Sequence, residues 1–528
     1  MEGLELVVIL GATLLVGGLI ASRIRVPAPL VLIVIGSGIG FLPFLSDLQL
    51  PPDVVLLLFL PALLYWEAFN SSWREIRRNL RVILLMSVGL TLATAVLVAV
   101  IAHAFGLPWS IAIALGAILA PTDATAVSAI AGRLPRRQAT TLRAESLIND
   151  GTALTLYAVA VAAAVSGGDV SIGETSLRFL LSYGVALLVG LVIGFATRLL
   201  RRVIGEDRLL ANTLSVLTPF LAYLPAEALH ASGVVAVVTT GLVVSQVAVP
   251  LISARTRSQA YGFWQLATYL LNGALFVLIG VQLHSVIEGL DGSWGPTLLL
   301  GLAATAAVIV ARLAWINTTP YLIRMVDRRP VQRTRRISFR QRIPLGWAGF
   351  RGAVSLAAAL ALPAQTASGD PLPGRDVVIA VTFVVILLTL FVQGLTLPAV
   401  VKWGRLPDDP TELDERLLAD QVIVQAVLDE LDGLAERLRT PDATVTAYRE
   451  MLEERLARIH RSDDDPSVAS LDEDTHDSRL RLAALQIKRD ALFDLRDSGR
   501  IDDVILRRTM AHIDIEELRL SAVDPEND

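Results

Sequence analysis

The sequence contains thirteen apolar runs, each long enough to cross a lipid bilayer as a helix. A helix needs roughly 17 to 25 residues to cross about 30 Å of hydrocarbon. Backbone polar groups inside hydrocarbon must bond within the protein, so helices of this length are the natural spanning element. We therefore predict an all-α polytopic membrane protein, with spans near residues 4–22, 27–46, 52–69, 81–104, 109–132, 141–165, 176–200, 207–226, 231–249, 259–284, 295–322, 343–365 and 375–401.

Arginine content alternates between successive loops. The odd-numbered loops hold nearly all the arginines, whereas the even-numbered loops hold almost none apart from Arg375. Cytoplasmic loops of membrane proteins carry the excess of Lys and Arg. We therefore expect a multi-pass protein of the cell membrane (the inner or cytoplasmic membrane), with its N-terminus outside and its C-terminus in the cytoplasm.

Charge divides the chain into two expected domains, 1–403 and 404–528. Residues 1–402 carry 29 Lys and Arg against 19 Asp and Glu, a net charge of +10, whereas residues 403–528 carry 17 against 32, a net charge of −15. The basic loops suit anionic lipid headgroups, so no nucleic-acid partner is expected. In the tail, apolar residues recur at three, four and seven between Leu413 and Leu438, which predicts a soluble helical domain. Further helices are expected near 442–461, 476–498 and 500–521.

The fifth and twelfth spans are interrupted. Pro121 removes a backbone donor and disfavours helix at the residue before it, and three glycines surround Arg351 in the twelfth span. Broken backbone at membrane depth is tolerated inside protein or beside a cavity. Interrupted spans in corresponding positions of two halves are typical of secondary transporters with inverted repeats and alternating access. We expect two inverted six-helix repeats joined by a linker span.

Buried acids gather at the head of the sixth span. On a helix, Ser146 shares a face with Asp150, and Glu145 shares the adjoining face with Asn149. An ionisable group at mid-membrane costs roughly 2.5 to 3.5 kcal/mol and usually faces a partner or an ion path. The alternative interpretation is that these residues form only the polar cap of a helix that enters the membrane here.

Asp150 is the candidate that holds either a proton or a small alkali cation. Exchange of one charge for one charge moves no net charge, and the neutral side chain of Asn149 agrees with that stoichiometry. Asp123 and Thr122 are candidates for further oxygen ligands of a transported sodium ion, although Asp123 could instead cap the broken helix. Arg312, a further arginine within a span, is expected to snorkel or to pair with polar groups.

Four motifs together resemble the sodium/proton exchangers of the monovalent cation:proton antiporter-1 family, across about residues 5 to 402. They are Pro121-Thr122-Asp123 with Ala126 and Val127, Glu145 to Gly151, Leu271-Asn272 with Leu278-Ile279-Gly280, and Gly349 to Leu356.

The resemblance implies an electroneutral homodimeric exchanger in which the two interrupted helices cross. It implies cation and proton binding at Asp150, with Asp123, Thr122 and Ser146 nearby and Glu67 beside the cation path. It makes Glu145 and Arg351 a structural ion pair and makes Asn149 a support of the crossing. The family's usual proline after the motif aspartate is here Ala124. The tail resembles regulatory tails that bind a ligand or a protein.

Other functions remain as alternatives. Potassium/proton exchange on the same fold is the nearest, because oxygen ligands alone do not fix ion size. A ligand-gated cation channel would need a continuous filter around a pore axis, and the sequence has no such repeat. An enzyme is not expected, since there is no cysteine, His-Glu-x-x-His or Gly-x-Ser-x-Gly, and no cofactor is expected beyond transported sodium ions and protons.

Overall fold

The structure is a computed structural model of the whole chain. It describes residues 2–24, 26–41, 55–71, 73–123, 136–166, 172–205, 207–247, 254–288, 294–326, 338–405 and 410–464, together with short stretches between 484 and 517. The chain forms two compact units, 1–408 and 409–528. The division lies five residues beyond the expected boundary at 403.

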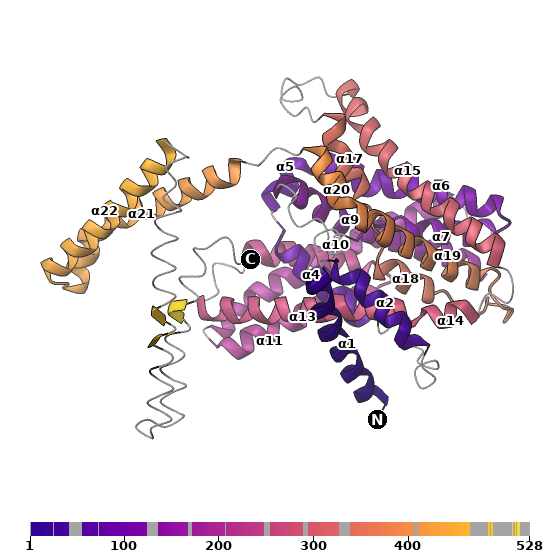
Figure 1. Cartoon of the computed structure of the whole chain (residues 1–528), viewed down its shortest axis with the longest axis horizontal. Coiled ribbons are helices and arrows are strands. Elements are labelled where there is room, and N and C mark those ends of the chain that lie inside the picture. Colours follow the sequence, from indigo (N-terminus) through magenta and orange to yellow (C-terminus); the bar gives the residue numbers. More distant parts are fainter. Residues whose placement is uncertain are drawn as a thin grey trace. The chain divides into compact units, whose positions relative to one another are not determined.

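Helices make up almost all of the described part of the first unit (Figure 1). In chain order they are α1 (Glu2–Ile24), α2 (Ala28–Gly40), the π-helix η1 (Val55–Phe59) with α4 (Leu60–Phe69), α5 (Trp73–Leu84), the π-helix η2 (Leu85–Gly89) with α6 (Leu90–Ala104), α7 (Trp109–Leu119), α9 (Arg136–Ser166), α10 (Ile172–Ile204), α11 (Arg208–Ala228), α12 (Gly233–Val247), α13 (Ala254–Val281), α14 (Leu283–Glu288), α15 (Trp294–Val326), α17 (Phe339–Trp347), α18 (Ala353–Leu360), α19 (Arg375–Leu388), the π-helix η4 (Thr389–Gln393) and α20 (Gly394–Gly404).

Eight helical segments of the described chain are long and apolar enough to cross a membrane. They are Val7–Ile24, Leu85–Ala104, Leu142–Ser166, Leu180–Ile204, Arg208–Ala228, Thr256–Glu288, Trp294–Tyr321 and Arg375–Gly404. Shorter apolar helices lie at Ala28–Gly40, Leu57–Phe69, Trp109–Leu119 and Gly233–Gln246. The prediction of an all-helical polytopic membrane protein is confirmed. Each of the thirteen expected spans overlaps a described helix, and their full number and inverted symmetry stay predictions.

The first unit is built from two groups of helices that meet along α9. We call α1, α2, α4 and α10–α13 the scaffold bundle, because α13 packs on α2, and α12 packs on both α4 and α10. We call α5–α7, α9, α15 and α17–α20 the core bundle, in which α7 packs on α6 and α9, and α15 packs on α6 and α19. Helix α9 belongs to the core bundle and also touches α4, α10 and α12 of the scaffold bundle.

The second unit begins with α21 (Pro410–Leu438) and α22 (Asp442–Asp464), which pack on each other. Arg439 adopts a left-handed conformation, with φ 53°, between them. The predicted apolar stripe is buried at Val424 and Leu431, whereas Leu438 is 68% exposed. The helices expected near 476–498 and 500–521 fall mostly outside the described residues.

Candidate functional site

The fifth span breaks where the sequence predicts. Helix α7 ends at Leu119, and the chain is no longer helical from Ala120 to Asp123. Pro121 is the cause, because it has no N–H to donate to the carbonyl one turn earlier, whereas Ala120 itself keeps helical dihedral angles, with φ −72° and ψ −42°. The last carbonyls of α7 are therefore left without helical partners.

Arg351 supplies donors for those carbonyls. Its Nε donates to the carbonyl of Leu119 at 2.8 Å, and its Nη2 donates to the carbonyl of Ala120 at 3.3 Å. Its Nη1 donates to the carbonyl of Gly349. Only 1% of Arg351 is exposed. The guanidinium faces the negative end of the α7 dipole, where a cation is stabilised.

The twelfth span is broken between α17 and α18, and it crosses the broken part of the fifth. The backbone N–H of Asp123 donates to the carbonyl of Phe350 at 2.9 Å. A Cβ atom on Gly352 would overlap the carboxylate of Asp123, so only glycine allows this approach. The backbone N–H of Arg351 donates to Thr389 Oγ1 at 3.2 Å, in the π-helix η4. The two interrupted segments are thus joined by backbone contacts.

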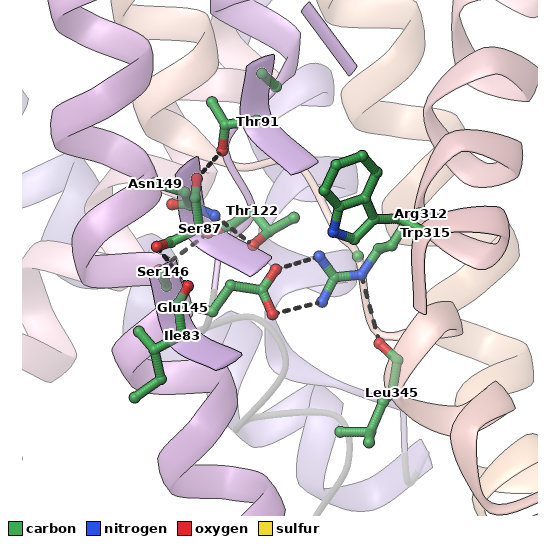
Figure 2. Close-up of polar contacts among 12 residues, drawn as sticks. Ile83, Ser87, Thr91, Thr122, Glu145, Ser146, Asn149, Arg312, Trp315 and Leu345 are labelled. Carbon is green, nitrogen blue, oxygen red and sulfur yellow. Dashed lines mark hydrogen bonds and ion pairs between the residues drawn. The ribbon is translucent and has the colours of Figure 1, made fainter. Parts of the chain in front are cut away.

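Glu145 is paired with Arg312, not with Arg351 (Figure 2). Arg312 Nη2 donates to Glu145 Oε2 at 3.2 Å and its Nη1 donates to Glu145 Oε1. Both side chains are 2% exposed. Arg312 Nε also donates to the carbonyl of Leu345 at 3.4 Å, near the end of α17. The expected Glu145–Arg351 pair is therefore corrected, because Arg351 is bonded to backbone carbonyls. Of the two roles expected for Arg312, pairing with a polar group is confirmed and snorkelling is not.

Side chains of α9 hold Thr122 in place (Figure 2). Ser146 Oγ donates to the carbonyl of Thr122 at 2.9 Å, and Asn149 Nδ2 donates to Thr122 Oγ1 at 2.9 Å. Ser146 and Asn149 are buried, with 4% and 2% exposed. These two bonds join α9 to the unwound segment that follows α7.

One pocket at the crossing brings together the residues expected to bind cation and proton. Its lining includes Glu67, Pro121, Thr122, Asp123, Ser146, Asp150, Asn272, Leu275, Gly352, Ala353, Val354 and Ser355, with Leu60, Leu63 and Leu64. Asp150 is 5% exposed, whereas Asp123 and Glu67 are half-buried. Core and scaffold bundles both contribute to this lining. The pocket therefore lies at the boundary between them.

The lining offers oxygen atoms from carboxylates, hydroxyls and one amide. Within the described residues, no three His, Cys, Asp or Glu side chains approach closely enough to hold a metal ion together. A cation here would take its ligands from a carboxylate with hydroxyl and carbonyl oxygens, which suits a weakly held alkali ion rather than a resident metal.

Two polar lining residues, Asn272 and Ser355, were not predicted as site residues, although both lie in motifs that carry the family resemblance. Asn272 is a polar residue inside a long apolar run, and Ser355 follows the glycine-rich break of the twelfth span. Either feature could have assigned its residue to the site. Glu145, Asn149 and Arg351 do not line the pocket but support the elements that do. Ala124, where the family pattern has proline, lies outside the described residues.

Comparison with known proteins identifies the family. A profile described as "Sodium/hydrogen exchanger, transmembrane" matches residues 11–403. The chain is 47% identical over 530 residues to the uncharacterized Na(+)/H(+) exchanger Rv2287 of Mycobacterium tuberculosis, covering 99% of this chain and 97% of that protein. It is 30% identical over 491 residues to the Na(+)/H(+) antiporter ApNhaP of Aphanothece halophytica, covering 91% and 90%.

The fold is shared with a solved transporter. The structure of the sodium proton antiporter MjNhaP1 from Methanocaldococcus jannaschii aligns with a TM-score of 0.59 and 20% identity, covering 77% of this chain and all of that one. The resemblance drawn from the motifs is confirmed. With a profile that spans most of its length and a relative that matches nearly all of it, the chain belongs to the sodium/hydrogen exchanger family of membrane transporters.

Proposed function

We propose that the protein exchanges sodium or lithium ions for protons across the cell membrane, by alternating access at the pocket around Asp150. The main observation that supports this proposal is that Asp150, Asp123 and Ser146 line one pocket at the crossing of two broken helices. Such an exchanger serves pH and sodium homeostasis.

The burial of Asp150 accounts for coupled exchange. An empty, ionised carboxylate with 5% exposure is costly, and within the described residues no basic side chain forms an ion pair with it. A proton or an alkali cation removes that cost, and each excludes the other from the same oxygens. The binding group therefore crosses in a neutral state with either occupant, and the neutral neighbour Asn149 adds no second charge. One cation then exchanges for one proton without net charge movement.

Asp123, Thr122, Ser146 and Glu67 are proposed as further groups of the cation and proton path. Their shared lining of the pocket supports this role. Potassium is the second candidate cargo, because oxygen ligands alone do not set the size of the ion. A ligand-gated channel is the less favoured alternative, since it requires a continuous filter.

The test is transport by purified protein in proteoliposomes. An imposed proton gradient is followed with a pH-sensitive dye while sodium, lithium or potassium is added, with the membrane potential free or clamped. We expect dequenching with sodium, insensitivity to the clamp, and loss of dequenching in Asp150→Asn. Asp376→Asn is the matched control, because it makes the same change at an exposed acid at the start of α19.

Each outcome of that experiment decides one part of the proposal. Exchange that persists in Asp150→Asn would remove Asp150 as the carrier. A response to potassium alone would replace sodium as the cargo, and a strong dependence on membrane potential would exclude electroneutral exchange. A wild-type protein that responds to no cation would overturn the proposal.

We also propose that the N-terminus lies outside and the acidic tail lies in the cytoplasm, on the alternation of arginine between loops. The chain has no cysteine, so single introduced cysteines report the side of the membrane. A membrane-impermeant maleimide should label Ser368→Cys in intact cells and Glu436→Cys after lysis, and the reverse pattern would invert the topology.

The proposed homodimer and the proposed regulatory role of the tail depend on the resemblance alone. Light scattering in detergent should give twice the mass of one chain, and a monomer mass would exclude the dimer. Removing residues 410–528 should leave exchange intact and alter its dependence on cytoplasmic pH, and an unchanged pH profile would exclude that role.

A further inference from the structure

A hydrogen bond joins the two bundles beside Asp150. Thr152 Oγ1 of α9, in the core bundle, lies 3.0 Å from the hydroxyl of Tyr183 of α10, in the scaffold bundle. Thr152 Oγ1 also donates to the carbonyl of Ile148, at 3.0 Å, one turn earlier in its own helix. A threonine hydroxyl has a single hydrogen. Tyr183 is therefore the donor in the bond between the bundles.

Two other side-chain bonds near this boundary stay within one bundle. Asn149 bonds to Thr122 inside the core bundle, and Trp264 Nε1 bonds to Ser215 Oγ inside the scaffold bundle. The bond from Tyr183 is different because its two ends belong to groups of helices that alternating access moves relative to each other.

The backbone of α9 lies very close to the scaffold bundle at this point. A Cβ atom on Gly151 would come within 2.7 Å of Val235 Cγ2 and 3.2 Å of the hydroxyl of Tyr183. Gly151 and Thr152 directly follow Asp150 in the chain, and Thr152 is fully buried. The segment that follows Asp150 thus packs directly against Val235 and Tyr183 of the scaffold bundle.

We propose that Tyr183 is a positioning residue that fastens the Asp150 segment to the scaffold bundle in this conformation, through a bond that breaks in each transport cycle. The inference rests on the proposed alternating-access exchange. A bond of 3.0 Å does not survive a relative displacement of a few ångström. It therefore stabilises the present state over the opposite one.

The size of the effect follows from the usual net contribution of one hydrogen bond. Such a bond favours the state that contains it by about fivefold in population. The apparent affinity for a ligand scales with the fraction of protein in the competent state. Removing the bond should weaken the apparent cation affinity on the side where the present state opens and strengthen it on the opposite side.

Tyr183→Phe removes the hydroxyl that donates to Thr152. Thr152 Oγ1 keeps its bond to the carbonyl of Ile148, so no buried group of α9 loses its last partner. The aromatic ring also keeps its packing. Thr155→Val is the matched control, because the hydroxyl of Thr155 is buried in the same helix and bonds the carbonyl of Gly151 within that helix, at 2.7 Å.

The experiment measures the apparent KM for sodium from each side of oriented proteoliposomes, with the thermal midpoint of each variant. For Tyr183→Phe we expect opposite KM shifts of up to about fivefold on the two sides, with a thermal midpoint close to wild type. Thr152→Val should give the same shifts, the double variant should add nothing, and Thr152→Ser should restore the wild-type values. Thr155→Val should leave both KM values unchanged.

Several results would overturn the inference. Unchanged KM values, equal shifts in the same direction on both sides, or additive effects in the double variant would each show that the bond does not set the conformational balance. These outcomes require a wild type that exchanges sodium for protons. They are therefore distinguishable from failure of the proposed function, in which the wild type transports nothing.

Discussion

The buried pair of Glu145 and Arg312 gives the sharpest test of the core bundle. Replacing Arg312 by Met removes the partner of a carboxylate that is 2% exposed. Two unit charges about 4 Å apart interact by about 4 kcal/mol at an effective dielectric constant near 20. Breaking a buried pair on one side costs about 3 to 5 kcal/mol, because the remaining charge is uncompensated. We expect Arg312→Met to lower the free energy of unfolding by about that amount.

The companion variant removes both charges. Glu145→Leu with Arg312→Met leaves an apolar contact and should recover most of the loss, since an apolar replacement of a buried pair is often neutral. Double-mutant cycles then give a coupling energy of about 2 to 4 kcal/mol for Glu145 with Arg312. The same cycle for Glu145 with Arg351 should give less than about 1 kcal/mol, because Arg351 is bonded to backbone carbonyls.

Reversible unfolding in mixed micelles measures these energies, with the fluorescence of the eight tryptophans as the signal. Transport need not be measured, so the result is independent of ion specificity. A coupling of Glu145 to Arg351 as large as its coupling to Arg312 would show that the observed pairing is not the one in solution.

Two further changes probe the crossing. Gly352→Ala should abolish exchange while the protein still reaches the membrane, because the added methyl group occupies the position of the Asp123 carboxylate; normal transport in vesicles would refute the close approach. Thr389→Val removes the acceptor of the Arg351 backbone N–H. Leaving that buried donor unpaired should lower the free energy of unfolding by about 1 to 3 kcal/mol in the same assay. Thr396→Val, at a partly exposed hydroxyl, should lower it less.

Features that depend on local chemistry could be predicted from the sequence. Span positions follow from the length of apolar runs, and the break at Ala120 follows from the missing donor of Pro121. The face shared by Ser146 and Asp150 follows from helical spacing, and both residues line the pocket. Each of these depends on residues within one or two turns of each other.

Features that depend on packing between distant helices could not be predicted from the sequence. Glu145 had two buried arginines as possible partners, and its spacing to either carries no information about which one lies near. The choice is made by α15, which packs on α6 and so brings Arg312 to α9. Asn272 reaches the pocket from the scaffold bundle, and the periodicity of α13 does not reveal that placement.

The charges around the crossing differ in whether the protein supplies their partners. Arg351 faces the carbonyl end of α7, and Asp123 lies against the N-terminal end of α18, where the dipole is positive. Glu145 is neutralised by Arg312. These groups each have a fixed compensation that does not depend on cargo.

Asp150 is different, because within the described chain no basic side chain forms an ion pair with it, although it is 5% exposed. A fixed cation at that position would compete with cargo and would compensate the negative charge of the carboxylate when the site is empty. Without one, the costly state is the unoccupied state, and in the proposed exchange the binding site changes sides of the membrane only when a proton or a cation is bound. A basic side chain introduced beside Asp150 should therefore abolish cation/proton exchange. Val354→Lys, at the pocket wall, should lose exchange in proteoliposomes at neutral pH, whereas Val354→Met should retain it. Equal exchange by the two variants would mean that the charge of Asp150 is not what cargo neutralises.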